Sequence, residues 1–206
     1  MLSPERAANL AWVLWALSWG AAAVWRKPAA NRAGAAAELP HLAITVIGLL
    51  LVFANPAAMR WGLSQVGLAQ PERLRLWPSN DLLGWTLFGL EVAGFAFCWW
   101  ARLHLGALWS GSVTRKEGHR IVETGPYALV RHPIYTGLIT SVLAIALLHA
   151  TAPALLGVAL VVLGFWLKAR LEERFLRAEL GPADYDAYAA RTPMLAPKLP
   201  APGRRS

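Results

Sequence analysis

The sequence predicts an all-α, polytopic membrane protein with about five transmembrane helices. The chain has 206 residues, of which 56% are hydrophobic and 16% are charged, and it contains 11 tryptophans. This composition is far more apolar than that of an ordinary soluble domain. The net charge of +8 would also suit a nucleic-acid-binding protein. However, the basic residues lie between and after apolar segments instead of forming an aromatic-interleaved patch, so we expect no nucleic-acid partner.

Three stretches in the first half of the chain are long enough to cross a bilayer, which requires roughly 20 apolar residues. They are residues 7–25, 39–59 and 82–101. We expect the first to be a membrane span and not a cleavable signal peptide, because its apolar region is long and Arg6 is the only basic residue ahead of it. We therefore expect residues 1–101 to form three membrane spans, and they carry no motif that we recognise.

A tight helical hairpin is predicted to form the fourth and fifth spans. The uncharged stretch 133–167 is too long for one helix and short for two, and "HATAP" at 149–153 interrupts it. The second helix of the hairpin should continue beyond the membrane surface to about Leu180. Gly181 and Pro182 should end it there.

The distribution of lysine and arginine predicts how these spans are oriented. With five spans, 16 of the 20 basic residues fall on one side of the membrane, in residues 26–38, 102–132 and 168–206. The positive-inside rule then places the N-terminus outside and the C-terminus in the cytoplasm. We expect residues 102–200 to form a cytoplasmic cofactor region together with the hairpin, and residues 201–206 to be a flexible tail.

Polar residues stand directly before the fourth span, in "ETGPYALVRHPIYTG". Proline disfavours α conformation in the residue before it, so the helix should begin at Pro133 with His132 as its cap. Arg131 and His132 then lie at a helix N-terminus, which favours an anion, and a guanidinium can bind a carboxylate in bidentate fashion. Alternatively, Arg131 only anchors the helix among lipid headgroups. The first turn adds two further candidates for ligand binding, Tyr135 and Gly137.

Two adjacent glutamates follow the fifth span, in "KARLEERFLRAELG". Glu172 shares its helical face with apolar residues, whereas Glu173 is bracketed by Arg170 and Arg177 at helical spacing. We therefore expect Glu172 to face a ligand and Glu173 to be a solvated or ion-paired surface residue. The alternative for Glu172 is a partly exposed carboxylate that pairs with Lys168.

The ordered set of motifs resembles the isoprenylcysteine carboxyl methyltransferase family and its phospholipid methyltransferase relatives. "GPYALVRHPIYTG" is followed by "EERFL", "GPADYDAY" and "TPMLAP", and preceded by "LGALWS" at 105–110 and "HRIVETG" at 119–125. The resemblance covers about residues 102–197. It implies methyl transfer from S-adenosylmethionine to a lipophilic or membrane-embedded acceptor, with the cofactor bound on the cytoplasmic side.

The resemblance also implies roles for individual residues. Arg131 and His132 would hold the carboxylate end of the cofactor, and Glu172, possibly with Glu173, would meet its amino group or ribose. The loop 121–127, with Tyr185 or Tyr188, would surround the adenine. Arg131 and Glu172 are the candidate catalytic residues. The full cofactor-binding set implied is His119, Val122, Gly125, Tyr127, Arg131, His132, Pro133, Tyr135, Gly137, Glu172, Glu173, Tyr185 and Tyr188.

Other site chemistries are poorly supported by the sequence. It contains no glycine-rich strand-turn-helix motif, so a Rossmann cofactor site is not expected. The histidines lack the spacing of metal ligands, so we expect no metal. A methyl group on a sulfonium is already activated, so the protein needs to supply only in-line orientation and exclusion of water.

Three other functions stay open. The acceptor could be the amine of a phospholipid, which would make the protein an N-methyltransferase. An NADPH-dependent membrane protein similar to sterol reductases would need cations for the 2′-phosphate, and Arg115, Lys116 and Arg120 could supply them. The chain could also be a non-catalytic membrane protein with this fold.

Glu91 lies near the middle of the third span, where a charged carboxylate facing lipid is costly. It should therefore face the bundle interior and be protonated or paired. One reading is that Glu91, together with Trp109, lines the entry of the acceptor and orients a cationic headgroup. The other is a neutral glutamate that donates a hydrogen bond to a neighbouring helix. Gly89 and Gly94 flank it and would allow another helix to approach closely.

Overall fold

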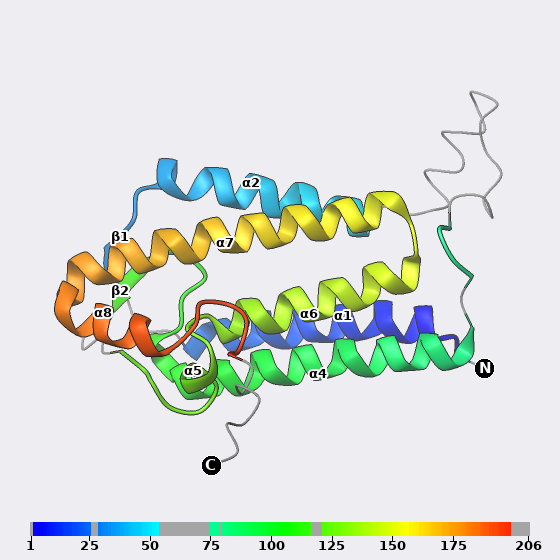
Figure 1. The fold of residues 1–206 in the computed structure, drawn as a ribbon, viewed down its shortest axis with the longest axis horizontal. Coiled ribbons are helices and arrows are strands. Elements are labelled where there is room, and N and C mark those ends of the chain that lie inside the picture. The colour runs from blue at the N-terminus through cyan, green and yellow to red at the C-terminus, as the bar shows by residue number, and fades with distance from the viewer. Residues whose placement is uncertain (1, 26–28, 54–74, 79, 117–120, 199–206) are drawn as a thin grey trace, which may run out of the picture.

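The computed structural model describes residues 2–25, 29–53, 75–78, 80–116 and 121–198. In this part of the chain, seven α-helices and one short β-ribbon form a bundle (Figure 1). The α-helices are α1 (Pro4–Ala21), α2 (Ala35–Val52), α4 (Asp81–Leu105), α5 (Pro126–Leu129), α6 (Pro133–His149), α7 (Ala152–Leu180) and α8 (Pro182–Arg191). Two 3₁₀ turns, η1 (Ala22–Trp25) and η3 (Gly106–Leu108), follow α1 and α4.

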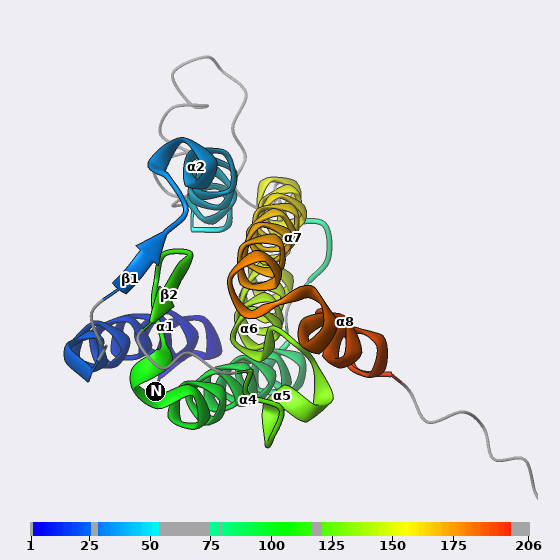
Figure 2. The same cartoon turned by 90° about the vertical axis from the view of Figure 1, so that its left-hand side faces the viewer.

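The helical fold class is confirmed, and a short β-ribbon that the sequence did not predict is added to it. Strand β1 (Ala29–Arg32) pairs with β2 (Thr114–Lys116) in antiparallel register. Strands this short do not show the period-two alternation that would identify them in a sequence. The ribbon joins the segment after α1 to the segment after α4, at the end of the bundle where α5 and α8 lie (Figure 2).

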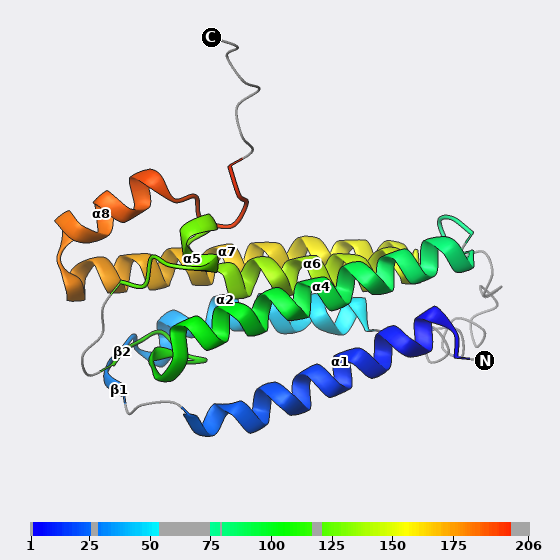
Figure 3. The same cartoon turned by 90° about the horizontal axis from the view of Figure 1, so that it is seen from below.

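The five long helices lie side by side and alternate in direction along the chain (Figure 3). Four of the stretches are long and apolar enough to cross a membrane: Pro4–Val24, Ala35–Val52, Asp81–Leu108 and Ala152–Glu179. The fifth predicted span corresponds to α6, which is apolar but has only 17 residues. The protein is thus an integral membrane protein. Residues 54–59, the end of the predicted second span, lie outside the described residues.

The helical hairpin is confirmed. Helix α6 begins at Pro133, and α7 ends at Leu180 before Gly181, which has a φ of 100°. Between the two helices, Ala150 adopts the left-handed conformation, with φ 54° and ψ 37°, and Thr151 caps α7. The Thr151 hydroxyl accepts a hydrogen bond from the Ala154 amide at 3.3 Å. The break within "HATAP" therefore arises from a left-handed residue followed by a helix cap.

Two helix pairs pack with their backbones in close contact at glycines. A Cβ atom on Gly94 of α4 would lie 2.6 Å from the carbonyl oxygen of Gly137 on α6. On the other side of the bundle, a Cβ on Gly48 of α2 would lie 2.7 Å from the carbonyl oxygen of Gly157 on α7. Small residues allow membrane helices to approach in this way. The prediction that Gly137 lets a ligand approach is wrong, because this residue faces α4.

We predict that Gly94→Ala destabilises the bundle by about 1–3 kcal/mol, because the new methyl group would collide with the backbone of α6. Gly89→Ala on the same helix is the matched control, since a Cβ there meets nothing within 4 Å. Thermal unfolding in detergent measures both variants. Equal midpoints for the two variants would show that α4 and α6 do not depend on this contact.

Candidate functional site

A cavity of about 260 Å³ lies at the end of the bundle that carries the β-ribbon, α5 and α8. Its walls are built from the end of α1, the segment 105–113, the start of α6 and the second half of α7, with α8 above. Ten of the residues singled out in the sequence line it: Trp109, Val122, Tyr127, Arg131, His132, Pro133, Tyr135, Glu172, Tyr185 and Tyr188.

The imidazole of His132 lies between the two glutamates of α7. Its Nδ1 is 3.4 Å from Glu172 Oε2, and its Nε2 is 3.0 Å from Glu173 Oε1. All three side chains are largely buried, with exposed fractions of 8%, 19% and 15%. Burial opposes the charged imidazole, but the hydrogen bonds and charges of the two carboxylates outweigh it and raise the pKa of His132. A carboxylate beside each ring nitrogen and the raised pKa both favour the imidazolium form of His132.

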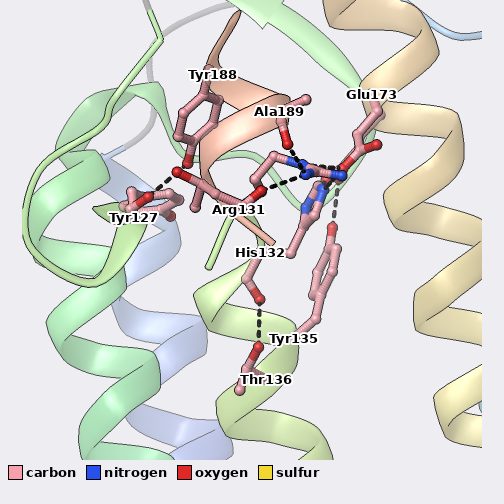
Figure 4. Close-up of polar contacts among 10 residues, drawn as sticks. Tyr127, Arg131, His132, Tyr135, Thr136, Glu173, Tyr188 and Ala189 are labelled. Carbon is pink, nitrogen blue, oxygen red and sulfur yellow. Dashed lines mark hydrogen bonds and ion pairs between the residues drawn. The ribbon is translucent and has the colours of Figure 1, made fainter. Parts of the chain in front are cut away.

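Arg131 ties the C-terminal segment to this cluster (Figure 4). Its Nε donates to Glu173 Oε1 at 2.8 Å, and its Nη1 donates to the carbonyls of Ala189 at 3.0 Å and Thr192 at 2.5 Å. Its main-chain N–H also donates to the Pro193 carbonyl at 2.8 Å. The side chain is only 11% exposed, so Arg131 is not a headgroup anchor. The guanidinium is mostly engaged, and Nη2 is the nitrogen without a partner among the described residues.

Glu173 is ion-paired, as one of the two expectations had it, but its surface position was predicted wrongly. Instead of lying at the surface between Arg170 and Arg177, Glu173 accepts hydrogen bonds from Arg131 and His132. The chain reverses after α7, and α8 lies along α7 so that the helix face carrying Glu173 is covered (Figures 2 and 4). Arg177 pairs with Asp186 of α8 at 2.6 Å. Helical spacing within α7 could not reveal a covering helix from further along the chain.

Glu172 lines the cavity, as its helical face predicted. The hydroxyl of Tyr135 donates to Glu172 Oε1 at 2.5 Å, and the Tyr135 ring is stacked between His132 and Phe165. The alternative partner, Lys168, donates instead to the Gly111 carbonyl at 2.6 Å. Glu172 is thus held by groups on α6, and its oxygens retain lone pairs toward the cavity.

Three tyrosines form one side of the cavity: Tyr127 of α5, and Tyr185 and Tyr188 of α8. The hydroxyl of Tyr188 donates to the Tyr127 carbonyl at 2.8 Å, which links α8 to α5. Tyr185 packs edge-on against Tyr188 with ring centroids 6.3 Å apart. Burial raises the pKa of all three phenols, so they stay neutral hydrogen-bonding groups at physiological pH.

Some predicted site residues lie elsewhere. Gly125 shapes the turn before α5, with φ 59°, where a Cβ would collide with the His104 ring. Glu91 faces the bundle interior as expected, but it does not line the cavity, so its proposed part in acceptor entry is not supported. Both of its carboxylate oxygens are buried without a hydrogen-bond partner among the described residues, so the expected hydrogen bond to a neighbouring helix is also absent there. His119 falls outside the described residues.

Sequence reasoning missed several residues of the cavity wall. Trp19 of α1, Lys168 of α7 and the segment 110–113 all line it. Trp19 lies more than 80 positions before the recognised motifs and carries no local signal of its role. Lys168 did carry a signal, because it is the first charged residue after the long apolar stretch and lies one turn before Glu172.

Two further predictions concern metals and NADPH. Among the described residues, no group of three or more His, Cys, Asp or Glu side chains is arranged to hold a metal ion. Of the basic residues considered for a 2′-phosphate, Arg115 and Lys116 belong to β2. Their side chains, and Arg120 as a whole, lie outside what the structure describes.

The fold and the site together define a helical integral membrane protein with a buried arginine, histidine and carboxylate cluster at one end of its bundle. Residues 87–178 match the model of the isoprenylcysteine carboxyl methyltransferase (ICMT) family. The match confirms the resemblance inferred from the motifs, and it includes Arg131, His132, Tyr135 and Glu172 of the site. The match begins within α4, earlier than the sequence motifs indicated.

A curated relative is the cobalt-zinc-cadmium resistance protein CzcN of Cupriavidus metallidurans. The two sequences are 30% identical over 128 residues, which cover 60% of this chain and 52% of the relative. The chain therefore spans about half the length of the curated relative that it matches.

We predict that the stability contributed by His132 depends on pH. Because its pKa is raised in the folded protein, the contribution should be complete below the ordinary value of about 6.5 and be lost as pH rises through the raised pKa. Thermal unfolding of the wild type and of His132→Gln between pH 5.5 and 9 measures this effect. The gap between the two midpoints should shrink with rising pH, and about 2–4 °C corresponds to 1 kcal/mol in a chain of this size. A gap that widens toward pH 9 would contradict a bridging imidazolium.

Proposed function

We propose that the protein transfers a methyl group from S-adenosylmethionine to a lipophilic or membrane-embedded acceptor. The observation that carries the proposal is the cluster of His132, Tyr135 and Glu172 on the wall of a cavity at the end of a membrane bundle, within the family-matched residues. The cluster presents a carboxylate whose position is fixed by two donors. A fixed carboxylate and a nearby guanidinium suit a ligand that carries both an ammonium and a carboxylate.

The cavity residues fit this cofactor in chemical type. Arg131 Nη2, which has no partner among the described residues, can bind a carboxylate, and the remaining lone pairs of Glu172 can accept from an ammonium or a ribose hydroxyl. Neutral tyrosines, such as Tyr127 and Tyr188, suit an adenine ring by stacking and hydrogen bonding. Arg131 would bind the carboxylate through one nitrogen and not in the bidentate fashion that we expected, because its Nε and Nη1 already donate to other groups.

The chemistry requires orientation more than proton transfer. When bound, the cofactor would supply a methyl group activated by a sulfonium. Arg131 and Glu172 would fix its amino-acid end, while the stacked rings of Tyr135 and Phe165 hold Glu172 in place and exclude water from the carboxylate. Positioning of this kind can contribute several kcal/mol to a substitution reaction.

The acceptor is inferred from the position of the cavity. It lies at the end of helices that cross the membrane, so a lipid-dissolved substrate can approach while the soluble cofactor enters from water. The prenylated carboxylate that gives the family its name is one candidate. A phospholipid amine is the second, which would make the protein an N-methyltransferase.

We expect five spans with the N-terminus outside and the cavity on the cytoplasmic side. The alternating directions of the five long helices support this arrangement, as does the placement of the N-terminus at the end opposite the cavity (Figure 1). A fluorescent protein and an alkaline phosphatase, each fused after Ser206, measure the side. The fluorescent protein should be active and the phosphatase, which needs an oxidising outside compartment, should be inactive. The reverse result would contradict the orientation.

We predict that purified protein binds S-adenosylhomocysteine in calorimetry and that Glu172→Gln weakens this binding by about tenfold, or 1.4 kcal/mol. Glu173→Gln should also weaken binding, because it removes the partner of Arg131 and His132, and it should lower thermal stability as well. Asp184→Asn, at an exposed position of α8, is the control. Binding of NADPH in the absence of any affinity for S-adenosylhomocysteine would favour the reductase-like alternative and overturn the proposal.

A further inference from the structure

The cavity has two walls of different chemistry. Its charged lining residues are Arg131, His132, Lys168 and Glu172, which come from the start of α6 and from α7. The second wall is apolar and comes from the ends of α1 and α4. We call it the aromatic wall, and it consists of Trp19, Leu105, Leu108 and Trp109. Helix α1 lies outside the family-matched residues 87–178. Part of the aromatic wall is therefore supplied by a segment that carries none of the family motifs.

Arg102 holds the aromatic wall together. It is only 1% exposed, although it is an arginine in a largely apolar helix. Nη1 donates to the Gly106 carbonyl at 2.8 Å, and Nη2 donates to the Ala22 carbonyl at 2.7 Å. The first bond stays within the end of α4, and the second joins it to the end of α1.

The same guanidinium lies against both indoles of the wall. Its central carbon is 4.1 Å from the ring centroid of Trp109 and 5.9 Å from that of Trp19. The two indoles meet edge to face at 5.5 Å. A planar guanidinium stacks on aromatic rings and hydrogen-bonds carbonyls at the same time, which neither lysine nor an apolar residue can do.

A buried arginine is a costly way to pack two helices. Its Nε has no hydrogen-bond partner among the described residues, and the site holds no carboxylate within ion-pair distance of it there. An apolar side chain of similar size would fill the same space without the desolvation cost. What the arginine adds is a fixed orientation for the rings of Trp19 and Trp109 on the cavity side.

We propose that Arg102 is a positioning residue and that the aromatic wall it assembles is the subsite for the hydrocarbon part of the methyl acceptor. The inference rests on the proposed function, because the charged wall would take the polar ends of the cofactor and leave the aromatic wall to the second substrate. The ligand class is a long alkyl, acyl or prenyl chain. Helix α1 then contributes to the choice of acceptor.

The test uses the full chain in detergent and a palmitic acid that carries a diazirine at the end of its chain. After irradiation, mass spectrometry measures labelling of the peptides containing Trp19 and residues 105–113 that excess palmitic acid competes away. Trp109→Leu is compared with Trp99→Leu, a matched control that contacts Trp19 at 5.5 Å from outside the cavity. The affinity for S-adenosylhomocysteine is measured on the same preparations.

In Trp109→Leu, we expect the labelling that palmitic acid competes away to fall about tenfold below that of the wild type. Its affinity for S-adenosylhomocysteine should stay within about twofold of the wild-type value. Trp99→Leu should label like the wild type. Arg102→Gln and Arg102→Lys should both lose labelling, because neither side chain can stack on Trp109 and donate to both carbonyls as the guanidinium does. If Trp109 and Arg102 only stabilised the fold, their variants would not lose labelling selectively while the affinity for S-adenosylhomocysteine is unchanged.

Three results would overturn the inference. Labelling could be equal in Trp109→Leu and Trp99→Leu, or cofactor affinity could fall in parallel with labelling, which would assign the wall to the cofactor. A folded Arg102→Gln variant could also label like the wild type. If the Arg102 variants do not fold, the tryptophan pair still decides. Failure of the wild type to bind S-adenosylhomocysteine would instead overturn the proposed function, since it is measured separately.

Discussion

The imidazole of His132, held between the carboxylates of Glu172 and Glu173, is the interaction on which the rest of the site depends. It joins the start of α6 to the far end of α7, two segments that are connected through the whole length of the hairpin. Neither carboxylate could be buried without such a donor, because an isolated buried charge is strongly disfavoured. Arg131 then neutralises the second carboxylate and draws the end of α8 onto the cluster.

The membrane explains why this cluster lies where it does. In a bilayer the helices must satisfy their own backbone groups, so polar chemistry is concentrated at the ends of the bundle. The glycine contacts Gly94–Gly137 and Gly48–Gly157 bring the helix pairs close, and this tight packing sets the positions of the helix ends. The cavity forms where α6 and α7 project beyond those contacts and are met by the ends of α1 and α4. A site with one charged and one aromatic wall follows from this convergence.

Local signals in the sequence predicted most of the long helices and many of the residues that line the cavity. Proline before α6, "HATAP" in the hairpin and Gly181 after α7 act through the backbone of their own segment, so their effects could be inferred directly. Glu172 lies on the cavity wall, and the apolar face of its own helix indicated that it would be turned away from solvent. Glu173 and Gly137 were misassigned because a distant helix, α8 or α4, decides what each one faces. The roles of Trp19 and Arg102 depend on contacts between α1 and α4, which no spacing within either helix encodes.

The most direct measurement is the transfer of labelled methyl from S-adenosylmethionine into lipid and protein extracts of membranes that contain the protein. A methyltransferase with this site should place label in a membrane-soluble product, and Glu172→Gln should lower the rate by about tenfold or more, equivalent to at least 1.4 kcal/mol of barrier. The same rate in a folded Glu172→Gln variant, or no label above that of membranes lacking the protein across lipid and protein fractions, would contradict a methyl-transfer site built on the His132 cluster.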